Sequence, residues 1–341
     1  MPKTLTENLE EFGRILEDAN IQPLWGRYAD ILPVELVARD RPMIWRWRDF
    51  APFVDRAARE VSMELAVRRV LMLVNPAFDG QPFTTSNLFA GIQILEPGEE
   101  APSHRHTPSA MRFIMEGSGG ATIVNGQRCD MYPGDLILTP NWAWHEHIND
   151  SNGRIVWLDA LDLPLSANIA PVVAEHGRSN TFAADLSAMP DEAFAGAGLT
   201  PDVEAPEFAY SPMFRYPWTR TLEAFANTPV LGDGSRRLRY TDPTTGGPVI
   251  VTMDSYAWEL APGRETRKRR TTANAVCLVV DGEGVSQVGD ETIEWCQHDV
   301  FTVPRWNWVS HEAADDGAHL FMFTDREVMR RLHFLREETV D

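Results

Sequence analysis

The chain of 341 residues is long enough for two domains of ordinary size, and it carries a formal net charge of −19 at pH 7. Its hydrophobic content of 43%, with 11 Trp and 16 Phe, suffices for packed cores and excludes a largely disordered chain. The acidic balance argues against nucleic-acid binding, because contacts with phosphates need clustered Lys and Arg. The one basic run, residues 264–270, contains no aromatic side chain, and we interpret it as a solvated or interface strand.

The three cysteines are scattered and odd in number, which predicts neither a disulfide framework nor a CxxC site; they are Cys129, Cys277 and Cys296. This usage favours a reducing compartment. The first twenty residues are acidic and lack an apolar stretch behind a basic start, and no apolar run is long enough to cross a membrane. We therefore expect a cytoplasmic protein with no membrane contact.

The chain begins with a helical pattern. Apolar residues recur at helical spacing within residues 6–19, at Leu9, Phe12, Ile15 and Leu16, with acidic residues between them. Residues 33–52 are rich in Pro, Arg and Trp, and we expect an irregular arm there.

From residue 64 the pattern changes to short runs of strand-forming residues separated by turns. Asn125-Gly126 is a typical hairpin turn. Many short antiparallel strands with turn residues between them predict a jelly-roll barrel. The expected strands are residues 66–74, 87–95, 111–116, 121–124, 136–139 and 154–160.

Four of the nine histidines fall within residues 104–147. His104 and His106 are two residues apart, so in a strand both imidazoles lie on the same face. His145, on a distant strand, can complete a set of three nitrogens. Such a facial set leaves positions of an octahedral metal open for substrate and dioxygen.

The spacing around these histidines is similar to the two signatures of the cupin family. Gly98, five residues, His104-X-His106 and then Gly117 match the first signature; Gly134, five residues, Pro140, His145 and Asn149 match the second. The usual glutamate ligand of cupins is expected near Ala110, where no carboxylate stands, and Trp142 replaces a usual glycine. We therefore expect three histidine ligands and no anionic ligand.

The second half of the chain repeats the pattern of the first. Residues 273–284, 289–304 and 306–308 echo residues 109–119, 126–140 and 142–144. In this alignment Arg269, Thr271 and Val309 replace the three histidines, and His311 corresponds to His147. We expect the second barrel to be metal-free, with a role in packing and assembly or, as an alternative, a different small-molecule pocket.

The repeat predicts an all-β bicupin of two jelly-roll barrels with an N-terminal helical arm and connecting segments. We expect the arm in residues 1–60, the metal-binding barrel in 61–165, a connector in 166–220 and the degenerate barrel in 221–341.

Nearly the whole chain resembles the gentisate 1,2-dioxygenase family, which includes salicylate and 1-hydroxy-2-naphthoate dioxygenases. The runs that carry the resemblance are residues 45–47, 66–71, 90–93, 104–117, 142–147 and 211–218. The resemblance implies one Fe(II) per chain in the first barrel, a homotetramer, and the use of dioxygen to open the ring of an aromatic 2-hydroxy acid. It also implies that the ring opens between the carboxyl- and hydroxyl-bearing carbons.

Two arginines are candidates to bind the substrate carboxylate, since a planar guanidinium pairs with it bidentately. Arg112 is six residues beyond His106 and so shares its face, while Arg68 comes from a preceding strand and its neighbour Arg69 should face away. The alternative for both is a surface or structural role.

The remaining candidates are polar and aromatic. His147 shares the face of His145, and the resemblance implies an acid/base role for it; Asp159 is a candidate to orient it. Gln93 could face the metal or the substrate. An aromatic slot for the substrate ring, or alternatively core packing, is expected for Phe89, Trp142 and Trp144.

The preferred substrate is left open between gentisate and salicylate, a substituted salicylate or 1-hydroxy-2-naphthoate. Gly91 would leave space near the pocket, which favours a less demanding wall. A non-catalytic, metal-dependent cupin sensor or storage protein is the alternative from another class. A fused helix-turn-helix would favour a sensor, and none is visible in the sequence.

Overall fold

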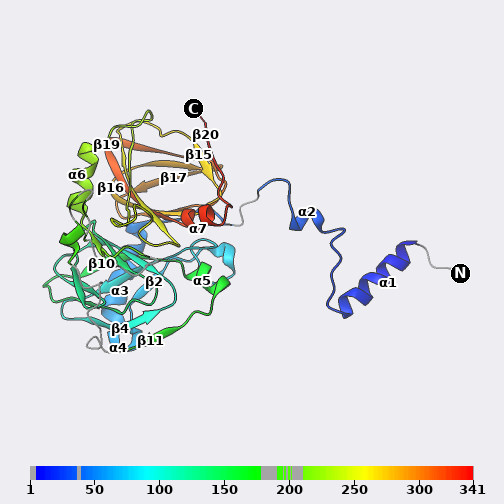
Figure 1. The fold of residues 1–341 in the computed structure, drawn as a ribbon, viewed down its shortest axis with the longest axis horizontal. Coiled ribbons are helices and arrows are strands. Elements are labelled where there is room, and N and C mark those ends of the chain that lie inside the picture. Colours follow the sequence, from blue (N-terminus) through cyan, green and yellow to red (C-terminus); the bar gives the residue numbers. More distant parts are fainter. Residues whose placement is uncertain are drawn as a thin grey trace. The chain divides into compact units, whose positions relative to one another are not determined.

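The computed structural model describes residues 5–36, 40–177, 190–194, 196, 199, 201 and 210–340. The chain divides into two compact units, Met1–Ala38 and Arg39–Asp341. The first unit contains helix α1 (Leu5–Asp18), which confirms the expected N-terminal helix, and the short helix α2 (Tyr28–Ile31) (Figure 1). No helix of the described segments has the length and apolarity that a membrane crossing requires.

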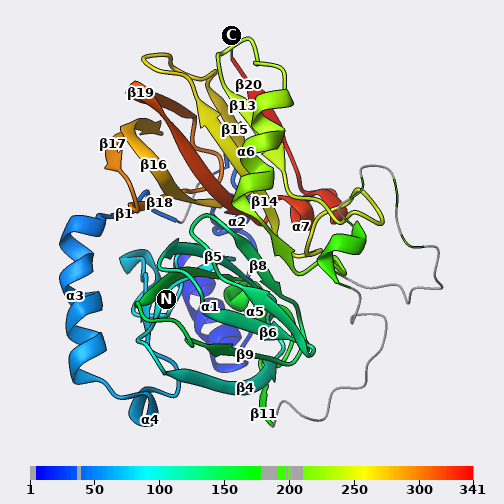
Figure 2. The ribbon, with the colours of Figure 1, turned by 90° about the vertical axis from the view of Figure 1, so that its left-hand side faces the viewer.

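Two facing antiparallel sheets form the first barrel of the second unit (Figures 1 and 2). The hairpin between β6 (Ala121–Val124) and β7 (Gln127–Asp130) turns at Asn125-Gly126, both with positive φ, as the sequence predicted. In order across the six-stranded sheet, the strands are β12 (Arg215–Tyr216), β8 (Leu136–Thr139), β5 (Ala110–Glu116), β10 (Ile155–Leu161), β3 (Phe89–Leu95) and β2 (Val70–Met72). The five-stranded sheet has the order β11 (Ala174–His176), β4 (Glu100–His106), β9 (His145–Ile148), β6 (Ala121–Val124) and β7 (Gln127–Asp130).

The second barrel is built from one strongly bent sheet of nine strands. Its two long strands, β16 (Ala275–Val288) and β19 (Val309–Thr324), pair antiparallel along almost their whole length, with two register shifts. The other strands are β1 (Ile44–Trp45), β13 (Arg236–Arg239), β14 (Asp254–Leu260), β15 (Arg269–Thr271), β17 (Glu291–Cys296), β18 (Val300–Val303) and β20 (Glu337–Thr339). The two barrels agree with the all-β bicupin that the sequence predicted.

The second unit also contains a few helices beside its sheets. The expectation of an irregular arm over residues 33–52 is wrong in part, because helix α3 begins at Trp47 and runs to Glu60. It carries Pro52 in its second turn, and Val54 is buried against the core. The remaining helices of the second unit are α4 (Met63–Ala66), α5 (Leu163–Ile169), α6 (Trp218–Asn227) and α7 (Arg326–Arg331), with short 3₁₀ turns at Pro76–Phe78 and Asp191–Phe194.

Segments that the sequence assigned to the arm and the connector complete the sheets. β1, from the arm, pairs with β18 of the second barrel. β11 pairs with β4 and β12 pairs with β8, so both ends of the expected connector add strands to the first barrel. In the middle of that connector, residues 178–189 and most of 195–209 lie outside the described residues. Edge strands leave backbone N–H and C=O groups unpaired, and these short additions satisfy them.

The six-stranded sheet of the first barrel packs its outer face against the second barrel. Phe113 of β5 stacks on Phe321 of β19 with ring centroids 4.3 Å apart, and both side chains are buried in one hydrophobic cluster. A polar contact adds to this packing, since Asn87 donates to the buried carboxylate of Asp325 at 2.7 Å. The alternation along β5 therefore turns Phe113 towards the second barrel and Arg112 into the first.

Candidate metal centre and substrate pocket

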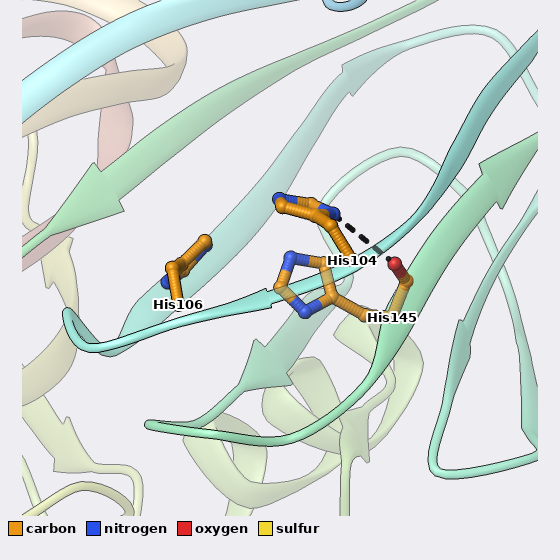
Figure 3. Close-up of side chains that lie close together, drawn as sticks. All are labelled: His104, His106 and His145. Atoms are coloured by element: carbon orange, nitrogen blue, oxygen red, sulfur yellow. Dashed lines mark hydrogen bonds between the residues drawn. The ribbon is translucent and has the colours of Figure 1, made fainter. Parts of the chain in front are cut away.

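His104, His106 and His145 converge inside the first barrel (Figure 3). His104 and His106 lie on β4, and His145 lies opposite His104 on the neighbouring strand β9. Their possible ligand nitrogens all lie within 4.8 Å of one another, and in the described residues no other group of three His, Cys, Asp or Glu side chains does so. Metal–nitrogen bonds of roughly 2.1 Å would place two ligands at most about 4.2 Å apart, so a small side-chain shift closes the set.

The protonation state of the three rings suits a metal. Burial, with Arg68 next in importance, lowers the pKa of His104 to about 2, and burial with Arg112 lowers the pKa of His106 to about 4. The pKa of His145 is also far below its usual range, mainly through burial. All three imidazoles are therefore neutral near pH 7, the form that coordinates metals.

Hydrogen bonds direct the Nε2 atoms towards the centre. Nδ1 of His145 lies 2.9 Å from the carbonyl oxygen of Ala143, and Nδ1 of His106 lies 2.6 Å from that of Pro108. A carbonyl only accepts, so both Nδ1 atoms carry the proton and both Nε2 atoms present a lone pair. Nε2 of His145 is buried without a hydrogen-bond partner in the described structure, as expected of a metal-binding nitrogen.

The second barrel repeats the strand register of the first barrel but has no histidines at the equivalent positions of the triad. Arg269 of β15 lies opposite Val309 of β19, as His104 lies opposite His145. The arginine and the valine thus occupy the positions that the sequence repeat assigned to them. Neither side chain is a ligand type that divalent metals use.

Arg112 lies inside the first barrel, but it is already paired. Its Nε is 3.2 Å from Oδ1 of Asp159, its cross-strand neighbour on β10, and its NH1 donates to the hydroxyl of Thr139. Asp159 also accepts from Nε1 of Trp157 at 3.0 Å. The structure corrects the expectation that Asp159 orients His147. The register of β5 and β10 places the Asp159 carboxylate beside Arg112.

Arg68 reaches the metal centre from the segment between α4 and β2. Its NH2 contacts the carbonyl oxygen of Pro102 and Nδ1 of His104, and its Nε is buried without a partner. Burial and the nearby Arg112 lower its pKa to about 10, so the guanidinium stays charged. The adjacent Arg69 faces away, as expected, and its buried guanidinium forms an ion pair with the partly exposed Glu99.

His104 has two competing contacts at Nδ1. The carbonyl oxygen of His145 lies 3.3 Å from this nitrogen (dashed in Figure 3), which requires Nδ1 to carry the proton. The contact with Arg68, a pure donor, requires the opposite tautomer. A metal bound at Nε2 would require the first arrangement, with the proton on Nδ1, and Arg68 would then have to leave this contact.

His147 is buried beside the triad, and its partner was not anticipated. Thr122 of β6, its cross-strand neighbour, lies with its hydroxyl 2.9 Å from Nδ1 of His147, and Nε2 is buried without a partner in the described structure. The ring is 5.2 Å from that of Trp157 on the facing sheet. The second barrel repeats this arrangement, because Oγ of Ser286 lies 2.7 Å from Nδ1 of His311.

Strand β3 contributes Phe89, Gly91 and Gln93 to one face. Gly91 lies opposite Asp159 and Gln93 opposite Trp157, so this face looks into the barrel. Nε2 of Gln93 is buried without a hydrogen-bond partner in the described structure. The space expected at Gly91 is filled, because a Cβ there would lie 2.7 Å from Val70 and 3.1 Å from the ring of Phe89.

Trp142 and Trp144 do not line the pocket, which corrects the expected aromatic slot. Arg105 alternates with His104 and His106 on β4 and so faces outwards; its guanidinium lies 5.1 Å from the ring of Trp142 and 4.8 Å from that of Trp144. These cation–π contacts hold both rings on the outside of the barrel. Of the three aromatic candidates, only Phe89 lies on the inner face.

Comparison with known proteins agrees with this geometry. A cupin domain model matches residues 91–161, which include the three histidines. Gentisate 1,2-dioxygenase 1 of Aquipseudomonas alcaligenes is 33% identical over 98% of this chain and 97% of its own length. The chain belongs to the family of gentisate and salicylate 1,2-dioxygenases. Members of this family are ring-cleaving enzymes that incorporate both atoms of dioxygen, so the chain is an oxidoreductase and the sensor or storage alternative is set aside.

Two further relatives of the 1,2-dioxygenase family span nearly the whole chain. The 5-aminosalicylate 1,2-dioxygenase of a Comamonas species is 35% identical over 99% of this chain and 92% of its own length. The crystal structure of salicylate 1,2-dioxygenase from Pseudoaminobacter salicylatoxidans with gentisate superimposes with a TM-score of 0.91 at 31% identity, over 99% of this chain and 96% of the other. The match therefore includes both barrels of the 1,2-dioxygenase fold.

Proposed function

We propose that this 1,2-dioxygenase binds one Fe(II) through His104, His106 and His145 and opens the ring of a 2-hydroxybenzoate between the carboxyl- and hydroxyl-bearing carbons. The observation that carries the proposal is the meeting of three neutral imidazoles with two guanidinium groups in one buried site. Iron bound there would supply adjacent open positions for the carboxylate and phenolate oxygens of the substrate and for dioxygen. Both oxygen atoms end in the ring-opened oxo-diacid.

Arg68 is the residue that we propose to bind the substrate carboxylate. In the described structure no carboxylate forms an ion pair with Arg68, and its Nε has no hydrogen-bond partner. Nε of Arg112 also lacks a hydrogen bond, but its guanidinium forms an ion pair with Asp159 at 3.2 Å and donates to Thr139. We infer that Arg68 leaves Nδ1 of His104 when metal binds and turns to the incoming carboxylate. In this arrangement Arg112 and Asp159 lie beside the bound substrate, and the guanidinium of Arg112 adds to the positive potential of the site.

His147 is the proposed acid/base. The Thr122 hydroxyl holds its Nδ1, and the buried Nε2 is available to take the phenolic proton of the substrate. Burial keeps the pKa of this ring well below its usual range, so the ring is neutral near pH 7 and one of its nitrogens carries a free lone pair. Gln93, with its unpartnered Nε2, is proposed to donate to a substrate oxygen, and Phe89 to contact the substrate ring.

The proposed substrate class covers gentisate and 5-substituted salicylates. It draws support from relatives named for gentisate and 5-aminosalicylate. Salicylate itself and 1-hydroxy-2-naphthoate remain candidates, although the filled space beside Gly91 removes one argument for a roomier wall. Dioxygen uptake by the iron-loaded enzyme with each of these acids ranks them directly.

The experiment that tests the carboxylate anchor compares arginine variants. Arg68→Ala should lower kcat/KM by roughly two orders of magnitude, because a desolvated charged hydrogen bond is worth about 2–5 kcal/mol. Arg68→Lys should recover only part of this loss, since an ammonium lacks the planar fork. Iron content should stay normal in both. Arg105→Ala, on the outer face of β4, is the matched control and should keep wild-type turnover.

If Arg68→Ala keeps wild-type kcat/KM while binding iron, the carboxylate anchor lies elsewhere. If no hydroxybenzoate drives dioxygen uptake in the iron-loaded wild type, the proposed substrate class is wrong.

The assembly and compartment belong to the same proposal: a homotetramer in the cytoplasm. The family resemblance supports the tetramer, and three free thiols support a reducing compartment. Sedimentation velocity measures the first, and fractionation of the producing cells measures the second.

A further inference from the structure

The second barrel contains a cavity at the position of the metal centre of the first. Its volume is about 530 Å³, within the range of roughly 300–1,000 Å³ typical of small-molecule sites. The lining includes Arg269 and Val309, which hold the register positions of His104 and His145. Positions equivalent to those of the histidine triad therefore line an open pocket in the second barrel.

Positive charge dominates this cavity, although the chain as a whole is strongly acidic. Five arginines line it, and three of them are neutralised by carboxylates: Arg239 by Asp254 at 2.7 Å, Arg270 by Glu338 at 2.6 Å and Arg326 by Glu337 at 2.7 Å. The other two arginines, Arg237 and Arg269, are left to give the pocket its net charge.

Arg269 makes no ion pair or side-chain hydrogen bond within the described part of the chain. Arg237 has a single carboxylate nearby, that of Asp233 at 3.7 Å, and its Nε is buried without a hydrogen-bond partner there. Burial, with Arg237 next in importance, lowers the pKa of Arg269 to about 9. Two poorly compensated guanidinium groups at one buried site are unfavourable unless an anion joins them.

An aromatic ring and a neutral imidazole complete the pocket. The ring of Trp258 lies 4.8 Å from the guanidinium of Arg237 and 4.1 Å from that of Arg269, and its Nε1 is buried without a partner in the described structure. Cation–π contact with one ring offsets only part of the cost of two buried cations. The cavity thus offers unpaired donors beside an aromatic face.

His311 is held as His147 is held in the first barrel. Nδ1 of His311 lies 2.7 Å from Oγ of Ser286, which accepts from Nε1 of Trp295 at 2.8 Å. Ser286 can then donate its own proton to Nδ1, which places the imidazole proton on Nε2. Burial lowers the pKa of His311 to about 3, so the ring is a neutral donor.

We propose that this cavity binds a small organic carboxylate, held by Arg237 and Arg269 with its apolar part against Trp258. Guanidinium groups match carboxylates geometrically, and the volume admits a molecule of the size of benzoate. Two sources share this chemistry: an aromatic acid of the substrate type and an aliphatic dicarboxylate of the product type. The proposal concerns the second barrel alone and does not depend on the chemistry of the first.

The test is calorimetric titration of the full-length protein with benzoate and, separately, with succinate. Benzoate has no neighbouring hydroxyl and cannot chelate a metal in the first barrel. We expect one binding event that Arg269→Gln and Arg237→Gln each weaken at least tenfold. Arg68→Ala should leave it unchanged, which separates this site from the first barrel. The stronger of the two probes identifies the source.

Arg236→Gln is the matched control, because Arg236 neighbours Arg237 on β13, faces the other way and pairs with Glu259. It should bind both probes as the wild type does. The melting temperature without ligand reports on folding, and Arg269→Gln should equal or exceed the wild type, since it removes a poorly compensated buried charge. No binding of either probe at millimolar concentration, unchanged binding by Arg269→Gln, or tighter binding of inorganic phosphate than of both probes would overturn the proposal.

Discussion

Nε of Arg112 lies 3.2 Å from Oδ1 of Asp159, across the neighbouring strands β5 and β10. Both side chains are almost fully buried, with 4% and 6% of their surface exposed. Burial raises the pKa of Asp159, and Arg112 opposes this rise. Arg112 and Asp159 therefore form a buried ion pair inside the first barrel. The carboxylate of Asp159 would compete with a substrate carboxylate for the guanidinium of Arg112.

Breaking this pair should destabilise the fold. In Arg112→Ala the carboxylate of Asp159 stays buried without its cation, so the free energy of unfolding should fall by about 3–5 kcal/mol. Replacing both residues, as Arg112→Met with Asp159→Leu, should recover much of that loss because no unpaired charge remains. Urea denaturation of the two single variants and the double variant measures the coupling. A loss below about 1 kcal/mol in both single variants would show that the pair is not coupled.

Removing any one histidine of the triad should remove the metal. His104→Ala, His106→Ala and His145→Ala should each lose bound iron and turnover, because two imidazoles hold a divalent cation far more weakly than three. Elemental analysis should give one iron per chain in the wild type, since Arg269, Thr271 and Val309 cannot form a second centre.

His176→Ala is the control for these variants. Its ring stacks 6.3 Å from that of His104 but lies outside the group of three, so its iron content should be normal. Full iron occupancy in any triad variant removes that residue from the site, and two irons per chain would contradict a metal-free second barrel.

The hydrogen bond between Thr122 and His147 should matter for turnover and not for metal. His147→Gln should lower kcat by about 100-fold or more, the usual contribution of a general acid or base. Thr122→Val should lower kcat by a smaller factor, roughly tenfold, because the ring loses the partner that orients it. Steady-state kinetics beside iron analysis separates the two effects, with Thr292→Val on β17 as a control. Equal KM and kcat in Thr122→Val and the wild type would exclude a positioning role.

Asp325 should make stability depend on pH in a predictable direction. Burial raises its pKa from 3.8 to about 6, so the folded protein holds this proton more tightly than the unfolded chain. Its stabilising contribution is complete below about pH 4 and is lost as the pH rises to about 6. A shift of two pKa units corresponds to about 3 kcal/mol. The stability of the wild type relative to Asp325→Asn should fall by up to this amount across that window.

Denaturation of both proteins at several pH values measures this difference. The variant also changes hydrogen bonds with Asn87 and Asn274. This shifts the free energy of unfolding by the same amount at every pH and so does not make the difference between the two proteins depend on pH. A difference that does not change between pH 4 and 6.5 would contradict the raised pKa.

The sequence alone determined which side chains share a face. Because strand side chains alternate with a period of two, His104 and His106 had to point together, as did His145 and His147. The spacing of glycines and prolines supplied the two cupin signatures, and their recurrence predicted the second barrel and the loss of its ligands. All of these are local properties of the chain.

Only the tertiary structure decided which faces meet across strands. Arg112 pairs with Asp159, and His147 with Thr122, because the register of separate strands puts them opposite each other. Trp142 and Trp144 lie outside the barrel because they stack on Arg105. A one-residue change of register would exchange inner and outer faces, and no local pattern specifies that register. For the same reason, the sequence did not predict the poorly compensated arginines of the second cavity. The carboxylates that neutralise the neighbouring arginines come from other segments of the chain.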